Sequence, residues 1–145
     1  MSKGYSVAVV GATGAVGEVM IEILEERKFP VDELHLLASE RSAGKRVMFG
    51  GTSHTVRNLA DFDFAAAQIG LFSAGGDISA LYAPKAAAAG CVVIDNTSHF
   101  RRDEDVPLII PEVNPHAIGG FTRRGIISNP NCSTIQMLVA LKPLH

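Results

Sequence analysis

Apolar runs that alternate with helical patterns predict an α/β fold for this chain. Five runs predict strands, at residues 7–10, 33–38, 69–72, 91–95 and 125–128, and the runs at 7–10, 69–72 and 91–95 are expected to be buried. Helical patterns follow the first, the third and the last of these runs. Because strands separated by helices pair in parallel, we expect a Rossmann-like, doubly wound, mostly parallel sheet with helices on both faces.

The first helical pattern is the clearest of the three. Val16, Val19, Met20, Ile23 and Leu24 recur at the spacing of one helical face, which predicts that this face is buried. Glutamates occupy the opposite face, at Glu18, Glu22, Glu25 and Glu26. The pattern therefore predicts an amphipathic helix directly after the first strand.

The segments between these elements carry weaker signals. Gly50 and Gly51 separate two short runs and predict a hairpin. Residues 59–68 are expected to form a weak helix or an irregular crossover, and residues 114–120 a short helical turn and a loop. Asp77 is expected to cap the helix that follows the third strand.

The composition narrows the classes of function. The chain has 145 residues, of which 47% are hydrophobic, and a formal net charge of −2. These values fit one domain, and the lack of a basic excess argues against nucleic acid or an anionic membrane as a partner. No apolar run approaches the ~20 residues of a membrane span, and no signal peptide precedes the first strand. With only two cysteines, Cys91 and Cys132, we expect free thiols and a cytoplasmic location.

Three glycines, Gly11, Gly14 and Gly17, join the first strand to the first helix at intervals of three. Glycine permits a tight turn and a close approach by a ligand. The helix start offers N–H groups and a positive dipole end to a phosphate. The motif therefore predicts a dinucleotide site, with glycines that serve packing alone as the alternative.

Small and polar residues follow the second and third strands. Ser39, Arg41 and Ser42 come after the second strand, where a dinucleotide fold contacts the adenosine ribose. A guanidinium beside two hydroxyls suits a 2′-phosphate, so we expect NADP rather than NAD as the cofactor. Glu40 is compatible with the ribose diol of NAD, and a solvated turn is the further alternative. Residues 73–76 are small enough to let a cofactor approach the third strand.

Cys132 lies at the predicted junction between the last strand and the last helix. A helix N-terminus favours the nucleophilic thiolate, and the N–H groups of its first turn can stabilise an oxyanion. A buried structural cysteine is the alternative, but the polar neighbours Asn131 and Ser133 argue against it. Cys91 is expected to pack as a small apolar residue, so Cys132 is the expected reactive thiol.

With these residues in place, the chain resembles the N-terminal part of the aspartate-semialdehyde dehydrogenases. The matching segments run in the family's order along nearly the whole chain, at residues 11–17, 39–45, 73–76, 95–98, 100–101, 106–108, 111–114 and 129–134. The resemblance implies cofactor contacts from Gly11, Thr13, Gly14, Ala15, Val16, Ser39, Arg41, Ser42, Ser73, Ala74 and Gly75. It implies phosphate or substrate contacts from Arg101 and Asn96, with Arg102 as the alternative to Arg101, and catalytic roles for Cys132 and Asn131. No metal is implied.

The resemblance implies NADPH-dependent reduction of β-aspartyl phosphate to aspartate semialdehyde, and the reverse phosphorylating oxidation, through a thioester on Cys132. In this family the reaction belongs to lysine, threonine and methionine biosynthesis. Residues 1–145 would be the NADP-binding domain, ending in the helix that starts near Cys132. A C-terminal catalytic and dimerisation domain would lie outside this chain, so we expect the chain alone to be inactive. The full-length protein is expected to be a homodimer or a homotetramer.

Two other interpretations stay open. N-acetyl-glutamyl-phosphate reductases share this organisation, but they typically carry Gly and Tyr around the cysteine, unlike Asn131 and Ser133. The second alternative is a non-catalytic NADP-binding module in which Cys132 is structural or redox-active. The reactivity of the Cys132 thiol distinguishes a catalytic chain from such a module.

Overall fold

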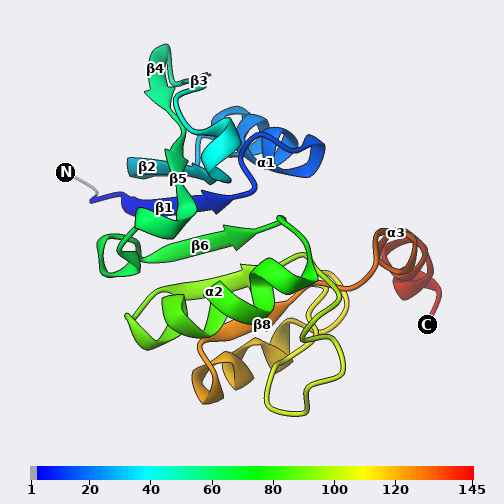
Figure 1. The fold of residues 1–145 in the computed structure, drawn as a ribbon. Coiled ribbons are helices and arrows are strands. Elements are labelled where there is room, and N and C mark those ends of the chain that lie inside the picture. Colours follow the sequence, from blue (N-terminus) through cyan, green and yellow to red (C-terminus); the bar gives the residue numbers. More distant parts are fainter. Residues whose placement is uncertain (1–2) are drawn as a thin grey trace.

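A six-stranded parallel sheet forms the centre of the computed structural model, which describes residues 3–145. The strand order is β5-β2-β1-β6-β7-β8 (Figure 1). The strands are β5 (Arg57–Asn58), β2 (Val31–Ala38), β1 (Tyr5–Val10), β6 (Ile69–Phe72), β7 (Val92–Asp95) and β8 (Ile126–Ser128). Each pairing is parallel, which confirms the predicted doubly wound fold.

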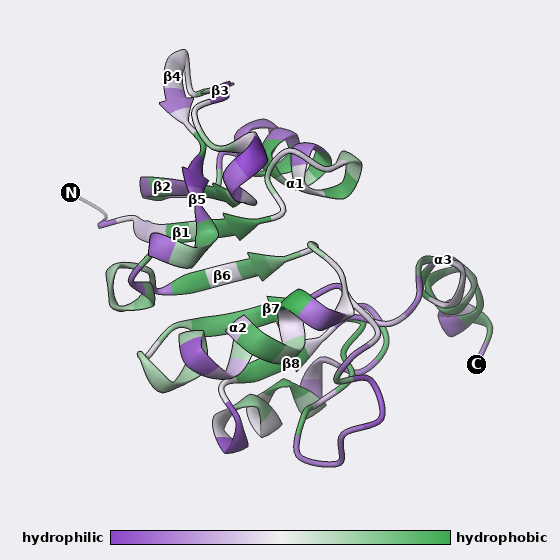
Figure 2. Ribbon diagram, in the orientation of Figure 1, coloured by the Kyte–Doolittle hydropathy of each residue, from purple (hydrophilic) through white to green (hydrophobic). Residues whose placement is uncertain are grey.

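The two helices α1 (Ala15–Glu26) and α2 (Gly76–Ala88) cover opposite faces of the sheet (Figure 1). Side chains of β1 alternate between these faces, so Val9 packs in the core on the α1 side and Val10 in the core on the α2 side. Both are fully buried. Figure 2 shows β1 and β7 mainly in the green of hydrophobic residues, as expected for strands covered on both faces.

The buried face predicted for α1 is partly wrong. The helix buries Gly17 and Ile21. Three residues of the predicted face are instead exposed by 41 to 50%: Val16, Val19 and Ile23. The physical reason is Gly17, whose missing side chain lets the helix approach β1 closely at this position. Its i+4 neighbour Ile21 then faces the sheet, and the apolar stripe is turned toward solvent.

The helix α2 begins at Gly76, before Asp77, and Asp77 is not its cap. Gly75 is the N-cap residue, its φ is +97°, and no side chain caps the helix start. Asp77 therefore lies inside the first turn, where its charge still complements the helix dipole. The helix ends at Ala88, and Gly90, with a φ of +90°, takes the left-handed conformation that often follows a helix end.

The predicted hairpin is confirmed as β3 (Arg46–Phe49) and β4 (Thr52–Thr55). The crossover before β6 is irregular, as expected, and contains the short 3-10 turns η2 (Leu59–Asp61) and η3 (Phe64–Ala66). The strand β5 was not predicted, because its two residues are too few to form a pattern.

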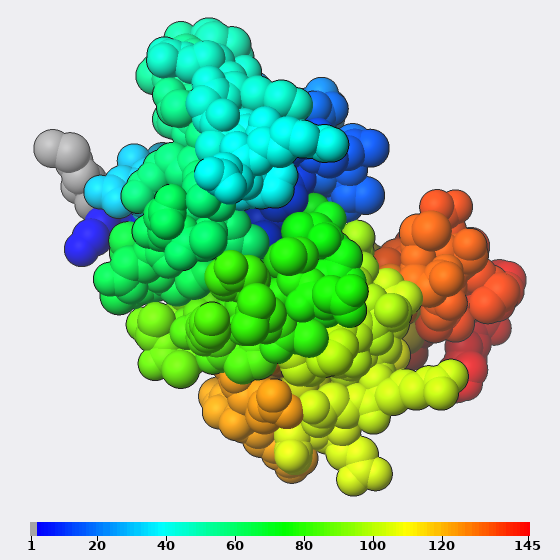
Figure 3. Space-filling view, in the orientation of Figure 1, coloured from blue at the N-terminus to red at the C-terminus, as the bar shows by residue number. Residues whose placement is uncertain are grey.

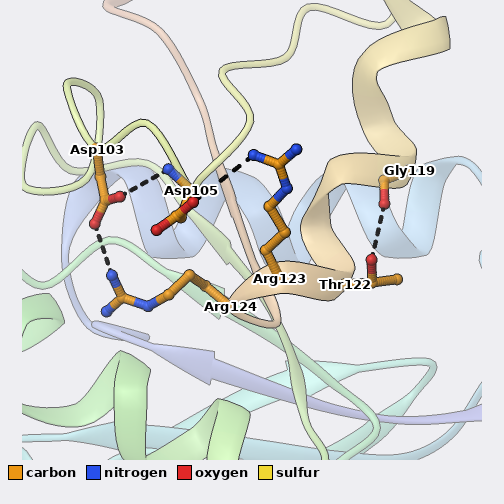
Figure 4. A network of polar contacts seen from close by, with 6 residues as sticks. All are labelled: Asp103, Asp105, Gly119, Thr122, Arg123 and Arg124. Atoms are coloured by element: carbon orange, nitrogen blue, oxygen red, sulfur yellow. Dashed lines mark hydrogen bonds and ion pairs between the residues drawn. The ribbon is translucent and has the colours of Figure 1, made fainter.

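The segment between β7 and β8 differs from the prediction of one short turn. It contains a nine-residue 3-10 helix, η4 (Pro115–Arg123). Figure 4 shows how ion pairs tie the preceding loop to this helix: Arg124 contacts Asp103 at 2.7 Å and Arg123 contacts Asp105 at 3.7 Å. Within η4, the Thr122 hydroxyl donates to the carbonyl of Gly119.

The outer edge of β8 is covered at its carboxyl end by residues 107–109. The N–H of Ser128 donates to the carbonyl of Pro107, and the N–H of Ile109 donates to the carbonyl of Ser128. Leu108 thereby forms an isolated parallel bridge with Ser128.

The last helix, α3 (Cys132–Leu141), lies at the side of the molecule (Figures 1 and 3). It has no buried residue, and Met137 and Leu141 are exposed by 55% and 49%. A short 3-10 turn, η5 (Lys142–Leu144), follows it. Among residues 3–145, no helix is long and apolar enough to cross a membrane.

A partly buried histidine lies near the amino ends of the central strands. His35 Nε2 is 3.1 Å from the hydroxyl of Ser6, which donates its own proton to the carbonyl of Ala66. Burial lowers the pKa of His35 from its ordinary value of 6.5, and Arg57 adds to this effect. The nearby Glu33 carboxylate opposes the shift without cancelling it.

We expect the free energy of unfolding to decrease as the pH falls below about 6.5, because the unfolded chain then binds a proton at His35 before the folded chain does. The loss continues until the pH passes the folded pKa. A His35→Gln variant should lose this part of the pH dependence. Urea unfolding of both proteins between about pH 5 and pH 8 measures the difference. Equal slopes for the two proteins would contradict the prediction.

Candidate functional site

The carboxyl ends of the parallel strands bring the candidate residues to one edge of the sheet. The first group follows β1, β2, β5 and β6, and the second group follows β7 and β8. In an open parallel sheet this edge is the usual place for ligands, at the point where the strand order reverses. Here that point lies between β1 and β6.

The glycine turn after β1 is held by the backbone of its neighbours. The N–H groups of Gly11 and Ala12 both donate to the carbonyl of Leu37, and Gly14 donates to the carbonyl of Gly11. The φ of Gly11 is +90°, which favours glycine. A Cβ on Gly17 would lie 2.0 Å from the carbonyl oxygen of Gly11, so no other residue fits there without movement of the backbone.

This close contact holds the start of α1 against the turn that follows β1. The N–H of Glu18 donates a hydrogen bond to the carbonyl of Gly14, which is the first hydrogen bond of the helix. The N–H groups of Ala15, Val16 and Gly17 precede that bond and lie at the positive end of the helix dipole. Backbone donors at a glycine-rich helix start are the groups that bind a pyrophosphate.

A cleft of about 290 Å³ adjoins this turn. Its lining includes four predicted residues, Gly11, Thr13, Ser39 and Ala74. It also includes residues that the sequence analysis missed, namely Ala38, Asn58, Leu59, Ala60, Ile78 and Tyr82. The short strand β5 carries Asn58 to this edge, and residues 58–60 could not be placed there without predicting β5.

The remaining predicted cofactor residues flank the cleft without lining it. Gly14, Ala15 and Val16 belong to the start of α1. Arg41 and Ser42 lie in the 3-10 turn η1 (Glu40–Ser42), directly after β2, and the N–H of Ser42 donates to the carbonyl of Ser39.

Two features of this edge matter for a cofactor. The exposed Arg41 takes part in none of the ion pairs within residues 3–145. Its guanidinium is therefore available to an anion. After β6, both the N–H and the hydroxyl of Ser73 donate to the carbonyl of Val10, which fixes the turn that leads to Gly75.

Cys132 lies at the predicted junction as the first residue of α3, and it is exposed. Asn131 is the N-cap, and its side-chain oxygen accepts hydrogen bonds from the N–H groups of Ser133 and Thr134 at 2.8 and 3.4 Å. The cap fixes the turn on which the thiol stands.

The cap corrects the expectation that the N–H groups of the first turn of this helix can all stabilise an oxyanion. Ser133 and Thr134 already donate to Asn131, so their N–H groups are not available to an oxyanion. The N–H of Cys132 itself is the first-turn donor that remains outside this cap. Asn131 thus acts in this structure through the helix it caps.

Arg101 joins the two loops at the second part of the edge. Its Nε donates to the carbonyl of Asn129 at 2.9 Å, and its Nη2 donates to the carbonyl of Asn96 at 3.1 Å. Arg101 is partly buried, whereas Arg102 is exposed and lies outside these contacts. The geometry therefore favours Arg101 over Arg102 as the cation of this site.

A buried carboxylate, that of Asp95, accepts hydrogen bonds that hold the loop after β7. Asp95 is fully buried and accepts hydrogen bonds from the hydroxyls of Ser79 and Thr97 and from the N–H of Thr97. Cys91, the other cysteine, is 1% exposed, and burial raises the pKa of its thiol to about 11. It packs as a small apolar residue, as predicted.

Comparison with known proteins identifies the chain's relatives. Residues 6–121 match the family described as semialdehyde dehydrogenase, NAD binding domain. A Vibrio cholerae protein named aspartate-semialdehyde dehydrogenase 2 is 64% identical over the whole chain, which spans 43% of that relative's length. The chain therefore spans less than half of this curated relative.

Solved structures agree with this assignment. The crystal structure of aspartate semialdehyde dehydrogenase II complexed with ASA from Vibrio cholerae has a TM-score of 0.96 at 64% identity, covering 97% of this chain and 46% of that chain. An aspartate semialdehyde dehydrogenase with NADP from Candida albicans has a TM-score of 0.78 at 28% identity, covering 97% of this chain and 46% of its own.

We expect iodoacetamide at about pH 7.5 to alkylate Cys132 at least about a hundredfold faster than Cys91. Cys132 is exposed, whereas Cys91 is buried, and this burial raises the pKa of its thiol to about 11 and so reduces its thiolate population. Peptide mapping over time measures both rates, with the urea-unfolded chain as the control in which they converge. Comparable rates in the folded protein would refute the prediction.

Proposed function

Because the chain belongs to the semialdehyde dehydrogenase, NAD-binding domain family, we propose that it supplies the cofactor cleft and the nucleophile of an aspartate-semialdehyde dehydrogenase. The observation that carries this proposal is the exposed Cys132 at the capped start of α3, on the same sheet edge as the cleft. The substrate pair is β-aspartyl phosphate and aspartate semialdehyde. The reaction would serve biosynthesis of lysine, threonine and methionine in the cytoplasm.

The residues of the cleft fit a nicotinamide dinucleotide. The contact between Gly17 and Gly11 leaves no room for a side chain, and the donors at the start of α1 suit a pyrophosphate. Leu59, Ile78 and Tyr82 offer an apolar wall to the adenine ring. NADP is the proposed cofactor, because Arg41 stands without a carboxylate partner near the end of β2.

The proposed chemistry begins at the thiol. The Cys132 sulfur forms a bond to the carbonyl carbon of the acyl phosphate, and the bond from that carbon to the phosphate oxygen breaks. Phosphate leaves with the electron pair of that bond, and a thioester remains on Cys132. Arg101 binds the departing phosphate through its guanidinium. When bound, the nicotinamide cofactor supplies the hydride that converts the thioester to the aldehyde and restores the thiolate.

The proposal extends to the assembly of the whole protein. The full-length enzyme is proposed to be a homodimer or a homotetramer that acts on a small-molecule substrate, without nucleic acid or membrane as a partner. Support for the substrate class comes from the Vibrio cholerae relative, whose structure is described as complexed with ASA.

The direct test is phosphate-dependent reduction of NADP by aspartate semialdehyde, measured on the protein expressed from its complete gene. We expect Cys132→Ala to lower this activity by at least about a thousandfold, because it removes the nucleophile. The matched control Cys91→Ala changes a buried thiol outside the site and should retain activity. Turnover that survives Cys132→Ala would overturn the proposed mechanism.

We expect Arg41→Ala to weaken NADP binding by about ten- to a hundredfold, since a hydrogen bond to a charged group contributes roughly 1.5–3 kcal/mol. Binding of NAD, which lacks the 2′-phosphate, should change little. Calorimetric titration with both cofactors measures the preference, and Arg46→Ala removes an exposed cation of the hairpin as the control. An unchanged preference for NADP in Arg41→Ala would contradict the assignment.

A further inference from the structure

A set of side-chain and backbone contacts joins the loops after β7 and β8. Asn96 and Asn129 directly follow these strands and occupy equivalent positions, because Asp95 pairs with Ser128. The N–H of Asn129 donates to the carbonyl of Asp95 at 2.8 Å, which extends the parallel ladder beyond β8. The side-chain Nδ2 of Asn129 donates to Oδ1 of Asn96 at 2.8 Å.

The Arg101 guanidinium spans the same two asparagines. Nε and Nη2 lie on one edge of its plane, and this edge donates to the carbonyls of Asn129 and Asn96. The other edge, formed by Nη1 and the second N–H of Nη2, has no protein partner within residues 3–145. A planar fork of two donors binds a phosphate or a carboxylate through two parallel hydrogen bonds.

The partners of Arg101 leave its charge uncompensated. Both are neutral carbonyls, and Arg101 belongs to none of the ion pairs among the described residues. A carboxylate in the same place would orient the guanidinium equally well, but it would compete with an incoming anion. Neutral carbonyls therefore orient the cation and keep its attraction for a phosphate.

The support for this arrangement is rigid and close to the thiol. Phe100, the residue before Arg101, is 4% exposed in the main core, and the buried Asp95 holds Thr97 from below. Asn129 is three residues before Cys132, so the two Cα atoms lie within about 11 Å. Asn129 therefore links Arg101 to the segment that carries Cys132.

We propose that Asn129 is a positioning residue, which holds Arg101 so that its unpaired edge presents a positive charge to the phosphate at Cys132. Its carbonyl anchors Nε, and its side-chain amide fixes Asn96, whose carbonyl anchors Nη2. This inference rests on the proposed function for the identity of the anion. The positioning of the charge itself can be measured without turnover.

The test compares two alkylating reagents at Cys132, the anion iodoacetate and the neutral iodoacetamide. A guanidinium held near the thiol favours the anion, so the ratio of the two rates reports the position of the charge. We expect Arg101→Gln to lower this ratio by roughly three- to tenfold, the size expected for one unit charge at a solvated site. Asn129→Ala should lower it by a smaller factor, because the backbone carbonyls that accept from Arg101 remain and only the side-chain hydrogen bond that fixes them is lost. Gln68→Ala removes a hydrogen bond that the side-chain amide oxygen accepts at the opposite edge of the sheet. This control variant should leave the ratio of the two rates unchanged.

A second variant keeps the test decisive if Asn129→Ala folds poorly. Asn96→Ala removes the same side-chain hydrogen bond from the other side, and like Asn129→Ala it keeps both backbone carbonyls, so it should lower the ratio to the same extent as Asn129→Ala. A merely structural role would change both rates together and leave the ratio constant. In the double variant of Asn129→Ala with Arg101→Gln, the ratio should fall no further than in Arg101→Gln alone.

Kinetics on the protein from the complete gene separate this inference from the proposed function. We expect Asn129→Ala to raise KM for phosphate by about tenfold while KM for NADP stays within about twofold. If the wild-type protein shows no phosphate-dependent activity, the proposed function fails while the reagent ratio still decides the positioning. A ratio that falls in Arg101→Gln but stays at the wild-type value in Asn129→Ala and Asn96→Ala would overturn the role of Asn129.

Discussion

Parallel pairing of the strands is the constraint on which the rest of the structure depends. It places the carboxyl end of every strand at the same edge of the sheet. Residues far apart in the sequence are therefore brought together by strand pairing, before their side chains make any contact. Register then sets the detail. Because Asp95 pairs with Ser128, the asparagines after β7 and β8 fall side by side, and Arg101 can bridge both. The site is thus a consequence of the backbone ladder, refined by a few polar side chains.

Local chemistry made much of this fold predictable. The glycine turn, the hairpin at Gly50 and Gly51 and the buried strands each carry their signal within a few residues. The same holds for Cys132, since a strand end, an N-cap asparagine and a helical pattern are adjacent in the chain. What these predictions share is that the cause of each structure lies next to it in the sequence.

The failures have the opposite cause, because they depend on contacts with distant residues. The side of α1 that faces the sheet is decided by the approach of Gly17 to Gly11, so periodicity alone selected three residues that are exposed. Asn58 reaches the cleft only through a strand of two residues that needs β2 as its partner. The proposed role of Asn129 could not be predicted either, because it depends on a hydrogen bond from the guanidinium of Arg101, 28 residues away along the chain.

The segment over the outer edge of β8 also affects how copies of the chain meet. An uncovered edge strand presents unpaired N–H and C=O groups that can recruit a strand from another molecule. At the carboxyl end of β8, residues 107–109 use both backbone groups of Ser128, and a proline lies at the start of this segment. The opposite edge ends in β5, which is two residues long. Both edge strands of the sheet are therefore poor templates for strand addition. This disfavours aggregation of copies of the chain through intermolecular β-pairing.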